Sequence, residues 1–211
     1  HPLISTAELV SATIVHSGTL QFDVQGDESK IVRLSESFPP DSWFSFNLGL
    51  SGQRWDIGLN EAVPSTLNLN GASGALDIDL TGMKLSSLRT HFGSGSSTTA
   101  LPASSIPYTV DIESGSGSVK AAIPEKTNLT LTLRSGSGSV NISIVPGTGV
   151  RVEVLDSGSG SVSIPGFKLV SGDGSFSHDT WQSDGFENSA NQVTILIQDR
   201  GSGSISIHYN N

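Results

Sequence analysis

The chain has 211 residues, no cysteine and a formal net charge of −9 at pH 7. The absence of cysteine excludes a disulfide framework and a thiolate metal site, and the acidic balance disfavours binding to nucleic acid or to anionic lipid. No stretch reaches the roughly 18 apolar residues that a membrane span needs, so the sequence predicts no span in this chain.

Composition favours a turn-rich all-β protein. The chain contains 24 glycines, and only 35% of its residues are hydrophobic. Disorder is the alternative for a chain rich in glycine and serine, but disordered segments lack aliphatic residues. Here Val, Ile and Leu recur in tight alternation with polar residues, which is typical of half-buried strands.

Residues 1–16 are predicted to form an extended N-terminal segment. The stretch from Thr6 to Val15 is long enough to be donated to a neighbouring copy as an added strand. The alternative is that this stretch folds back on its own subunit and covers a sheet edge. Its candidate assembly residues are Thr6, Leu9, Val10, Ala12, Ile14 and Val15.

Residues 17–60 lack any repeat and are predicted to form an antiparallel β cap. Residues 19–24 and 30–34 alternate on either side of a turn at 26–29, which indicates a hairpin. Residues 43–48 and 54–59 suggest a second hairpin in the same way.

A Gly-Ser turn recurs along residues 61–170, and this periodicity predicts a β-solenoid. The second glycine of each turn recurs every 21 or 22 residues, apart from one interval of 43 that corresponds to two periods. Flexible linkers do not recur at a fixed interval between strands, so ordered corners are favoured over a Gly-Ser linker. The predicted corner glycines are Gly74, Gly95, Gly117, Gly138, Gly160 and Gly203.

Each period contains two strand-like runs, which predicts two facing sheets. In residues 129–134, Leu129, Leu131 and Leu133 alternate with Thr130, Thr132 and Arg134. Alternation with a period of two places the leucines on the inner face and the polar residues outside. A single coil cannot bury its apolar face alone, so stability is expected to grow with the number of stacked coils.

The end of the chain departs from the repeat. Residues 171–192 are predicted to be an irregular insertion, and residues 193–211 the final solenoid strands. The last strand has no proline or lysine to block pairing, so it is expected to present a free edge. We expect head-to-tail assembly with other copies of the chain through this edge, with Ile205, Ile207 and Tyr209 as candidate assembly residues.

The sequence suggests no catalytic residue, no metal ligand and no cofactor. The five histidines show no spacing typical of metal ligands. Matches to Gly-x-Ser-x-Gly fall in the repeated corners, and a nucleophilic serine would not be needed in every coil.

Four further patterns have weaker functional interpretations. Thr130 and Thr132 resemble the Thr-x-Thr ladders of ice-binding solenoids, but neighbouring coils place charged residues outward, so no flat threonine array is expected. Asn128 and Asn141 match the glycosylation sequon, which is frequent by chance. Asp173 is predicted to be a turn residue, with a calcium ligand as the weaker alternative. Outward carboxylates could form calcium-binding ladders or simply a solvated face, and they are Asp77, Asp79, Asp111, Glu113, Glu153, Asp156 and Asp199.

Residues 53–64, with a tryptophan strand and a Val-Pro step, followed by the Gly-rich rungs of residues 67–85, resemble the toast-rack domains. The resemblance covers about residues 17–165. It implies a β-solenoid module of bacterial and archaeal cell envelopes, related to modules described as adhesin-like, and it supplies no catalytic residues.

Three functional classes follow. The first is a non-enzymatic structural or adhesive protein, extracellular or on the cell surface, that self-associates and could form a filament. The second is a ligand-binding or regulatory envelope module of toast-rack type, with surface glycans or envelope components as partners. The third and most distant is a calcium-dependent, carbohydrate-active β-helix enzyme.

Overall fold

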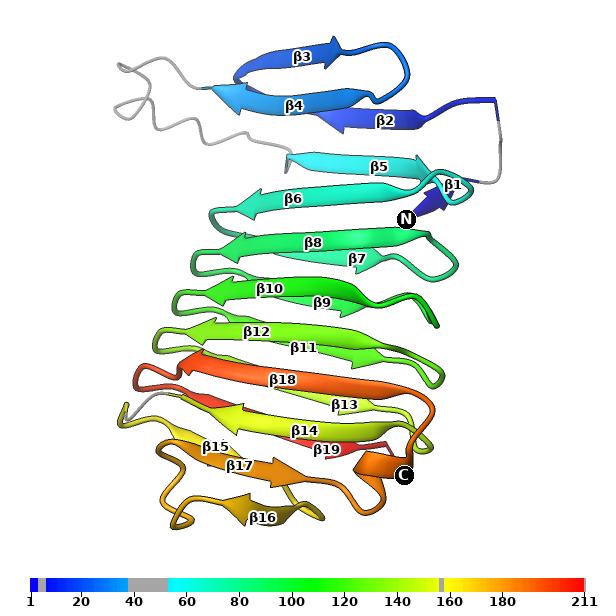
Figure 1. Cartoon of the computed structure of the whole chain (residues 1–211). Coiled ribbons are helices and arrows are strands. Elements are labelled where there is room, and N and C mark those ends of the chain that lie inside the picture. Colours follow the sequence, from blue (N-terminus) through cyan, green and yellow to red (C-terminus); the bar gives the residue numbers. More distant parts are fainter. Residues whose placement is uncertain (4–6, 38–52, 156–157, 211) are drawn as a thin grey trace. The chain divides into compact units, whose positions relative to one another are not determined.

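The computed structural model describes residues 1–3, 7–37, 53–155 and 158–210 (Figure 1). Regular structure in these residues is almost entirely β, with one short 3-10 helix, η2 (Phe186–Asn188). The all-β prediction is therefore confirmed. The chain divides into two compact units, a smaller one at Ala7–Leu59 and a larger one formed by His1–Thr6 and Asn60–Asn211.

The larger unit contains two sheets that run along the coil stack. The eight-stranded sheet has the order β16-β17-β14-β18-β12-β10-β8-β6, and the six-stranded sheet has the order β15-β19-β13-β11-β9-β7. The strands of the larger unit are β1 (Pro2–Leu3), β6 (Ser65–Gly71), β7 (Ala75–Asp79), β8 (Leu85–Phe92), β9 (Ser96–Ala100), β10 (Tyr108–Ser114), β11 (Ser118–Ile123), β12 (Leu129–Ser135), β13 (Ser139–Ile144), β14 (Gly149–Val154), β15 (Ser161–Ser163), β16 (Lys168–Ser171), β17 (Asp179–Gln182), β18 (Gln192–Asp199) and β19 (Ser204–Tyr209).

From β6 to β13 the coils stack in the order of the sequence. Strands β6, β8, β10 and β12 pair in parallel in one sheet, and β7, β9, β11 and β13 do so in the other. Each coil thus gives one strand to each sheet, as a β-solenoid requires. The predicted solenoid with two strands per coil is confirmed.

The core lies between the two sheets and consists of the predicted inward residues. Leu131 and Leu133 are fully buried, while Thr130 between Leu129 and Leu131 is exposed. Ile142, Ile144, Val150 and the other inward positions of β11 to β14 are buried in the same way. Alternation therefore predicts correctly which face of these strands is inside.

The last coil does not lie at the end of the stack. Strand β18 lies between β12 and β14, and β19 lies between β13 and β15 (Figure 1). The expectation that the last strand presents a free edge is therefore wrong. Ile205 and Ile207 are buried in the core at 1% and 0% exposure, because the coil is inserted between two earlier coils.

The predicted irregular segment at 171–192 includes short regular elements. Strand β17 runs antiparallel to β14 and also pairs with β16, which ends the eight-stranded sheet. The loop between β16 and β17 is organised by the buried carboxylate of Asp179, which accepts hydrogen bonds from the backbone amides of Asp173, Gly174 and Phe176. Trp181 stacks on Phe176 with ring centroids 5.1 Å apart.

The smaller unit contains two antiparallel ladders formed by β2 (Val10–Val15), β3 (Thr19–Gln25), β4 (Ile31–Ser37) and β5 (Arg54–Asn60). Strands β3 and β4 form the first predicted hairpin. In the second ladder β5 pairs with β2, and the predicted partner at residues 43–48 lies outside the described residues. Every buried hydrophobic side chain in the described part of the chain belongs to the larger unit.

Candidate functional site

The predicted corner glycines form a column along one edge of the stack. Between adjacent coils, the backbone amide of the residue that follows one corner glycine donates to the carbonyl oxygen of the corner glycine in the neighbouring coil. This ladder comprises Ser96 to Gly74, Ser118 to Gly95, Ser139 to Gly117, Ser204 to Gly138 and Ser161 to Gly203, at 2.9–3.1 Å. Gly203 therefore lies between Gly138 and Gly160, and not after Gly160 as its position in the sequence suggests.

Glycine is required at the inner positions of this column because adjacent backbones approach very closely there. A Cβ atom added at Gly117, Gly138 or Gly203 would lie 1.9 Å from the carbonyl oxygen of the corner glycine in the neighbouring coil. At Gly95 the corresponding distance is 2.0 Å. A side chain at these positions would have to displace backbone, so the glycines have a structural role that their spacing correctly predicts.

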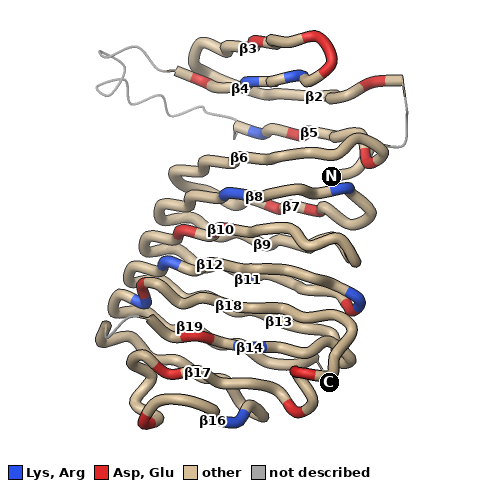
Figure 2. Tube along the Cα trace, viewed as in Figure 1, with Lys and Arg blue, Asp and Glu red and all other residues tan. Residues whose placement is uncertain are grey.

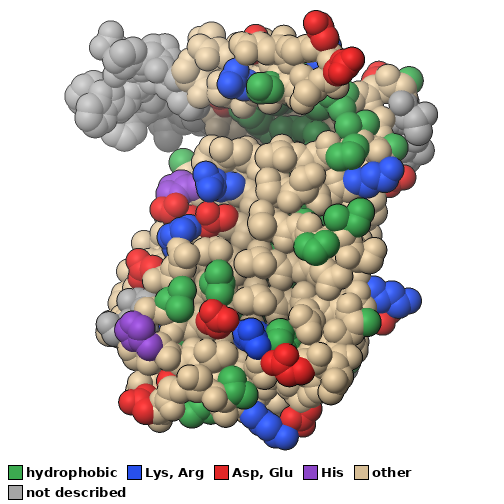
Figure 3. Space-filling view, in the orientation of Figure 1, with side chains coloured by type: hydrophobic (Ala, Val, Ile, Leu, Met, Phe, Trp, Pro, Cys, Tyr) green, Lys and Arg blue, Asp and Glu red, His purple; other side chains and the backbone are tan. Residues whose placement is uncertain are grey.

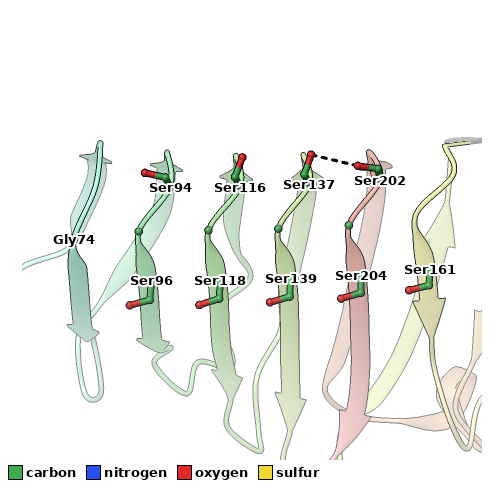
Figure 4. Close-up of a pocket in the computed structure, with 14 residues that line it drawn as sticks. Gly74, Ser94, Ser96, Ser116, Ser118, Ser137, Ser139, Ser161, Ser202 and Ser204 are labelled. Carbon is green, nitrogen blue, oxygen red and sulfur yellow. Dashed lines mark hydrogen bonds between the residues drawn. The ribbon is translucent and has the colours of Figure 1, made fainter.

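The serines beside the glycine column form an open groove of about 820 Å³. Figure 4 shows two rows of serines that follow the stacked corners, with the last coil in its inserted position. The lining serines are Ser94, Ser116, Ser137 and Ser202 in one row and Ser96, Ser118, Ser139, Ser204 and Ser161 in the other. Among the residues drawn in Figure 4, the hydroxyl of Ser202 donates to that of Ser137 in the same row at 3.3 Å.

A smaller pocket of about 210 Å³ lies on the outer face of the eight-stranded sheet. Asp111 lies between two guanidinium groups, with Arg134 at 2.6 Å and Arg89 at 3.5 Å. His91 lies 3.4 Å from Glu113 on the same face. The two arginines and the histidine in this pocket are therefore paired with its carboxylates.

Charged side chains are scattered over the larger unit. Figures 2 and 3 show single charges or small groups separated by uncharged surface. The carboxylates considered as calcium ligands lie on different sheets, with Asp77 and Asp79 on β7 and Asp111, Glu113 and Glu153 on β10 and β14. Among the described residues no three His, Asp or Glu side chains are grouped as metal ligands, and Asp156 lies outside those residues.

Two other aspartates hold turns. Asp173 accepts a hydrogen bond from the backbone amide of Ser175, and hydrogen bonding by Ser175 lowers the pKa of Asp173. Asp199 accepts a hydrogen bond from the backbone amide of Gly201 at 2.8 Å. Asp173 is thus a turn residue, as its sequence context predicts.

The threonine row is longer than the sequence suggests. Thr130 lies between Thr109 and Thr194 in the sheet. The row then continues to Ser87 on one side and Arg151 on the other, and Thr132 lies beside Asp111. Sequence reasoning missed Thr194, because nothing in the repeat indicates that β18 is the neighbour of β12.

The two sequons have different environments. Asn128 donates from Nδ2 to the carbonyl oxygen of Ser105 at 2.8 Å and accepts at Oδ1 from the backbone amide of Gln192 at 2.8 Å. Its side-chain amide therefore helps to hold the last coil in place. Asn141 is exposed on β13. Glycosylation at either asparagine stays a prediction.

The candidate assembly strands are paired within the chain in different ways. Strand β19, which carries Ile205, Ile207 and Tyr209, has a neighbour on both sides. Strand β2, which carries Val10, Ala12, Ile14 and Val15, pairs on one side with β5 and ends its sheet among the described residues. Leu9 precedes this strand, and Thr6 lies outside the described residues.

Comparison with known proteins identifies the family. A family model described as the N-terminal domain of toast_rack, DUF2154, matches residues 5–122. This match spans more than half of the chain. The protein belongs to the toast-rack family, as the resemblance in the sequence predicts.

A solved structure shares the fold of this chain. It is the crystal structure of a "putative cell adhesion protein" from Clostridium sporogenes, with a TM-score of 0.60 and 18% sequence identity. The likeness covers 98% of this chain and 85% of that one. The comparison with curated proteins gives no match. No helix in the described residues is long and apolar enough to cross a membrane.

Proposed function

We propose that this toast-rack protein is a non-enzymatic structural or adhesive component of the cell surface that self-associates head to tail. Family membership and the fold shared with the Clostridium sporogenes protein support an adhesin-like role in an extracellular or surface location. The observation that carries self-association is the presence of strand edges that lack partners within the described part of the chain.

We assign the contact between copies to two of these edges, those of β16 and β2. Strand β16 ends the eight-stranded sheet, and all four of its residues are exposed, with Leu169 at 38% and Val170 at 53%. Strand β2 ends the ladder that it forms with β5. An exposed edge presents free N–H and C=O groups to another strand. Joining β2 of one copy to β16 of the next uses two different surfaces, so the contact propagates into a filament.

Substitutions at the β16 edge test this proposal. Val170→Pro removes a backbone N–H donor from the edge strand β16. The control is Thr130→Lys, which adds a charge on an exposed sheet face away from the edge and leaves the backbone of the internal strand β12 intact. We expect long particles from the parent protein and the Thr130→Lys variant in light scattering and electron microscopy, and short ones from Val170→Pro.

Deletion of residues 1–14 should shorten the particles in the same way, because it removes most of β2. A parent protein that stays monomeric at high concentration would contradict the proposal. Long particles from both edge variants would contradict the assignment of β2 and β16.

The serine groove favours a second candidate function, that of a ligand-binding envelope module. Stacked strands repeat at about 4.7–4.9 Å, so the two rows offer hydroxyls at regular intervals along an open groove. Such rows suit the hydroxyls of a linear glycan. Polysaccharide binding by the parent protein that is lost in Ser118→Ala/Ser139→Ala, but kept in Ser143→Ala outside the groove, would support this function.

A further inference from the structure

The last coil fills a slot between two coils that follow one another in the sequence. Strand β18 pairs in parallel with β12 and β14, and β19 pairs in parallel with β13 and β15. Both walls of the slot therefore precede the strands that fill it. Strands β18 and β19, which follow η2 in the sequence, fill the slot.

Apolar packing makes this coil an integral part of the core. Ile195 lies between Leu131 and Val152 in the eight-stranded sheet, and all three side chains are fully buried. Ile205 lies between Val140 and Val162 in the six-stranded sheet. An unfilled slot would expose aliphatic side chains on both walls, which favours insertion of a matching coil.

Polar contacts select this coil over the other Gly-Ser coils. At one end of β12, Asn128 accepts from the backbone amide of Gln192. At the other end Arg134 donates to Gln198 at 2.5 Å, beside a shift in the register between β12 and β18. The hydroxyl of Tyr209 donates to the carbonyl oxygen of Thr148 at 2.8 Å. The fit therefore depends on features that belong to residues 192–209.

Residues 183–191 connect the inserted coil to β17. This connection is held by the buried ring of Phe186, which lies under the guanidinium of Arg151 at 4.6 Å. Once released and extended, the connection could span roughly 30 Å. That reach permits the coil to enter its own slot or the slot of an adjacent copy.

We propose that the slot accepts the terminal coil of a second copy, so that copies of the chain are joined by coil exchange. The pairings of β18 and β19 are the same in the closed and the exchanged form, and the two forms differ only in the path of residues 183–191. Exchange of an identical element is a low-cost route to association. This joint is independent of the pairing between β2 and β16.

Cysteine pairs in the full chain test the exchange, because the protein has no cysteine of its own. Thr130 and Thr194 are direct neighbours on β12 and β18, and adjacent strands bring Cα atoms within disulfide range. Thr130→Cys and Thr194→Cys chains, each full length and differently tagged, are co-expressed or refolded together and then oxidised. We expect a covalent heterodimer on a non-reducing gel.

The matched control is Thr109→Cys with Thr130→Cys. These residues are also direct neighbours, but on β10 and β12, which lie in consecutive coils and offer no slot. Exchange predicts several-fold more heterodimer from the first pair than from this control. Equal yields would overturn the proposal, provided that the double variant Thr130→Cys/Thr194→Cys closes its disulfide within one chain. Edge pairing and coil exchange can fail separately. If Val170→Pro abolishes filaments while the heterodimer still forms, edge pairing is disrupted and exchange is not.

Discussion

The solenoid has two regions, the coils formed by β6 to β13 and those formed by β14 to β19. The coils pack in a similar way in both, but only in the first does their order in the stack follow their order in the sequence. In the first region each coil lies beside the one that precedes it in the sequence. In the second region β18 and β19 lie between coils that come earlier in the sequence. In both regions the stacked coils pair in parallel over an aliphatic interior and turn at Gly-Ser corners, and the second region adds the antiparallel strands β16 and β17.

This comparison teaches that a sequence repeat defines a coil without defining its place in the stack. Every coil of this kind can pair on both sides, because its backbone edges are alike. The order is set instead by connections and by individual polar contacts, such as the one between Asn128 and Gln192. Substitutions that act equally or unequally on the two regions can therefore test the interleaved order.

The largest effect is expected from a buried charge in either region. Leu131→Asp and Ile195→Asp each place a carboxylate in a fully buried site, which should cost more than about 4 kcal/mol and unfold the larger unit. Thr130→Asp is the control, since Thr130 is exposed beside Leu131. Thermal unfolding followed by circular dichroism measures all three variants.

The interleaved order requires similar damage from Leu131→Asp and Ile195→Asp. A coil attached at the end of the stack would leave Ile195 on a peripheral strand with a much smaller cost. A mild effect of Ile195→Asp beside a severe effect of Leu131→Asp would therefore contradict the order described above.

The next largest effect is expected at the corners. Gly203→Ala places a Cβ atom 1.9 Å from the carbonyl oxygen of Gly138, so it should destabilise the protein by about 1–3 kcal/mol, in the range of overpacked cores. Gly71→Ala meets no atom closer than 3.6 Å and should stay within about 0.5 kcal/mol of the parent. Urea unfolding compares the two variants. Equal stability of both would show that Gly203 does not lie against Gly138.

Much of this fold could be predicted from the sequence, because its signals are local. The alternation of Leu129, Leu131 and Leu133 fixes a strand face, and the recurrence of Gly117 and Gly138 fixes a corner. The position of β18 and β19 could not be predicted, because pairing between strands that are far apart in the sequence leaves no periodic trace.

The candidate site shows the same division. The glycine column follows from spacing alone, whereas the order of the serine rows depends on where Ser202 and Ser204 enter. The sequence predicts a free edge at β19 for the same reason, whereas β19 is paired on both sides. Strand β16 (Lys168–Ser171) lies at the boundary between the predicted solenoid and the predicted irregular insertion, where the repeat gives no sign of an edge strand.

A moderate effect is expected at the contact that ties the two regions together. Asn128→Ala removes hydrogen bonds to Ser105 and Gln192 and should cost about 1–3 kcal/mol. Asn141→Ala changes an exposed sequon asparagine and should cost less than about 0.5 kcal/mol. Denaturant unfolding of the unglycosylated protein measures both. The assignment of Asn128 as a structural contact fails if the two variants are equally stable.

The smallest expected effect is on the pH dependence of stability, and it comes from Tyr108 in the region formed by β6 to β13. Tyr108 is buried and donates to the carbonyl oxygen of Pro102 at 2.8 Å, and burial raises the pKa of its phenol. The fold therefore favours the neutral phenol, and its contribution to stability is present below the unfolded pKa of about 10 and is lost as the pH rises above it.

Tyr108→Phe should cost about 1 kcal/mol at neutral pH through the lost hydrogen bond. It should also weaken the loss of stability between about pH 9 and pH 11, where the tyrosine of the unfolded chain ionises. Tyr209, whose pKa is also raised by burial, retains its share of that loss. Urea midpoints across this range should therefore fall less steeply in the variant, and an unchanged slope would contradict the role given to Tyr108.

Hydrogen exchange of the backbone amides in β18 and β19 tests the interleaved order most directly. With neighbours on both sides, the amides of Val193, Ile195 and Ile197 should be protected as strongly as those of β12, and far more strongly than those of β16 at the end of the sheet. Mass spectrometry of peptides from these segments resolves the difference. Exchange of β18 and β19 at the rate of β16 would contradict the insertion of the last coil into the middle of the stack.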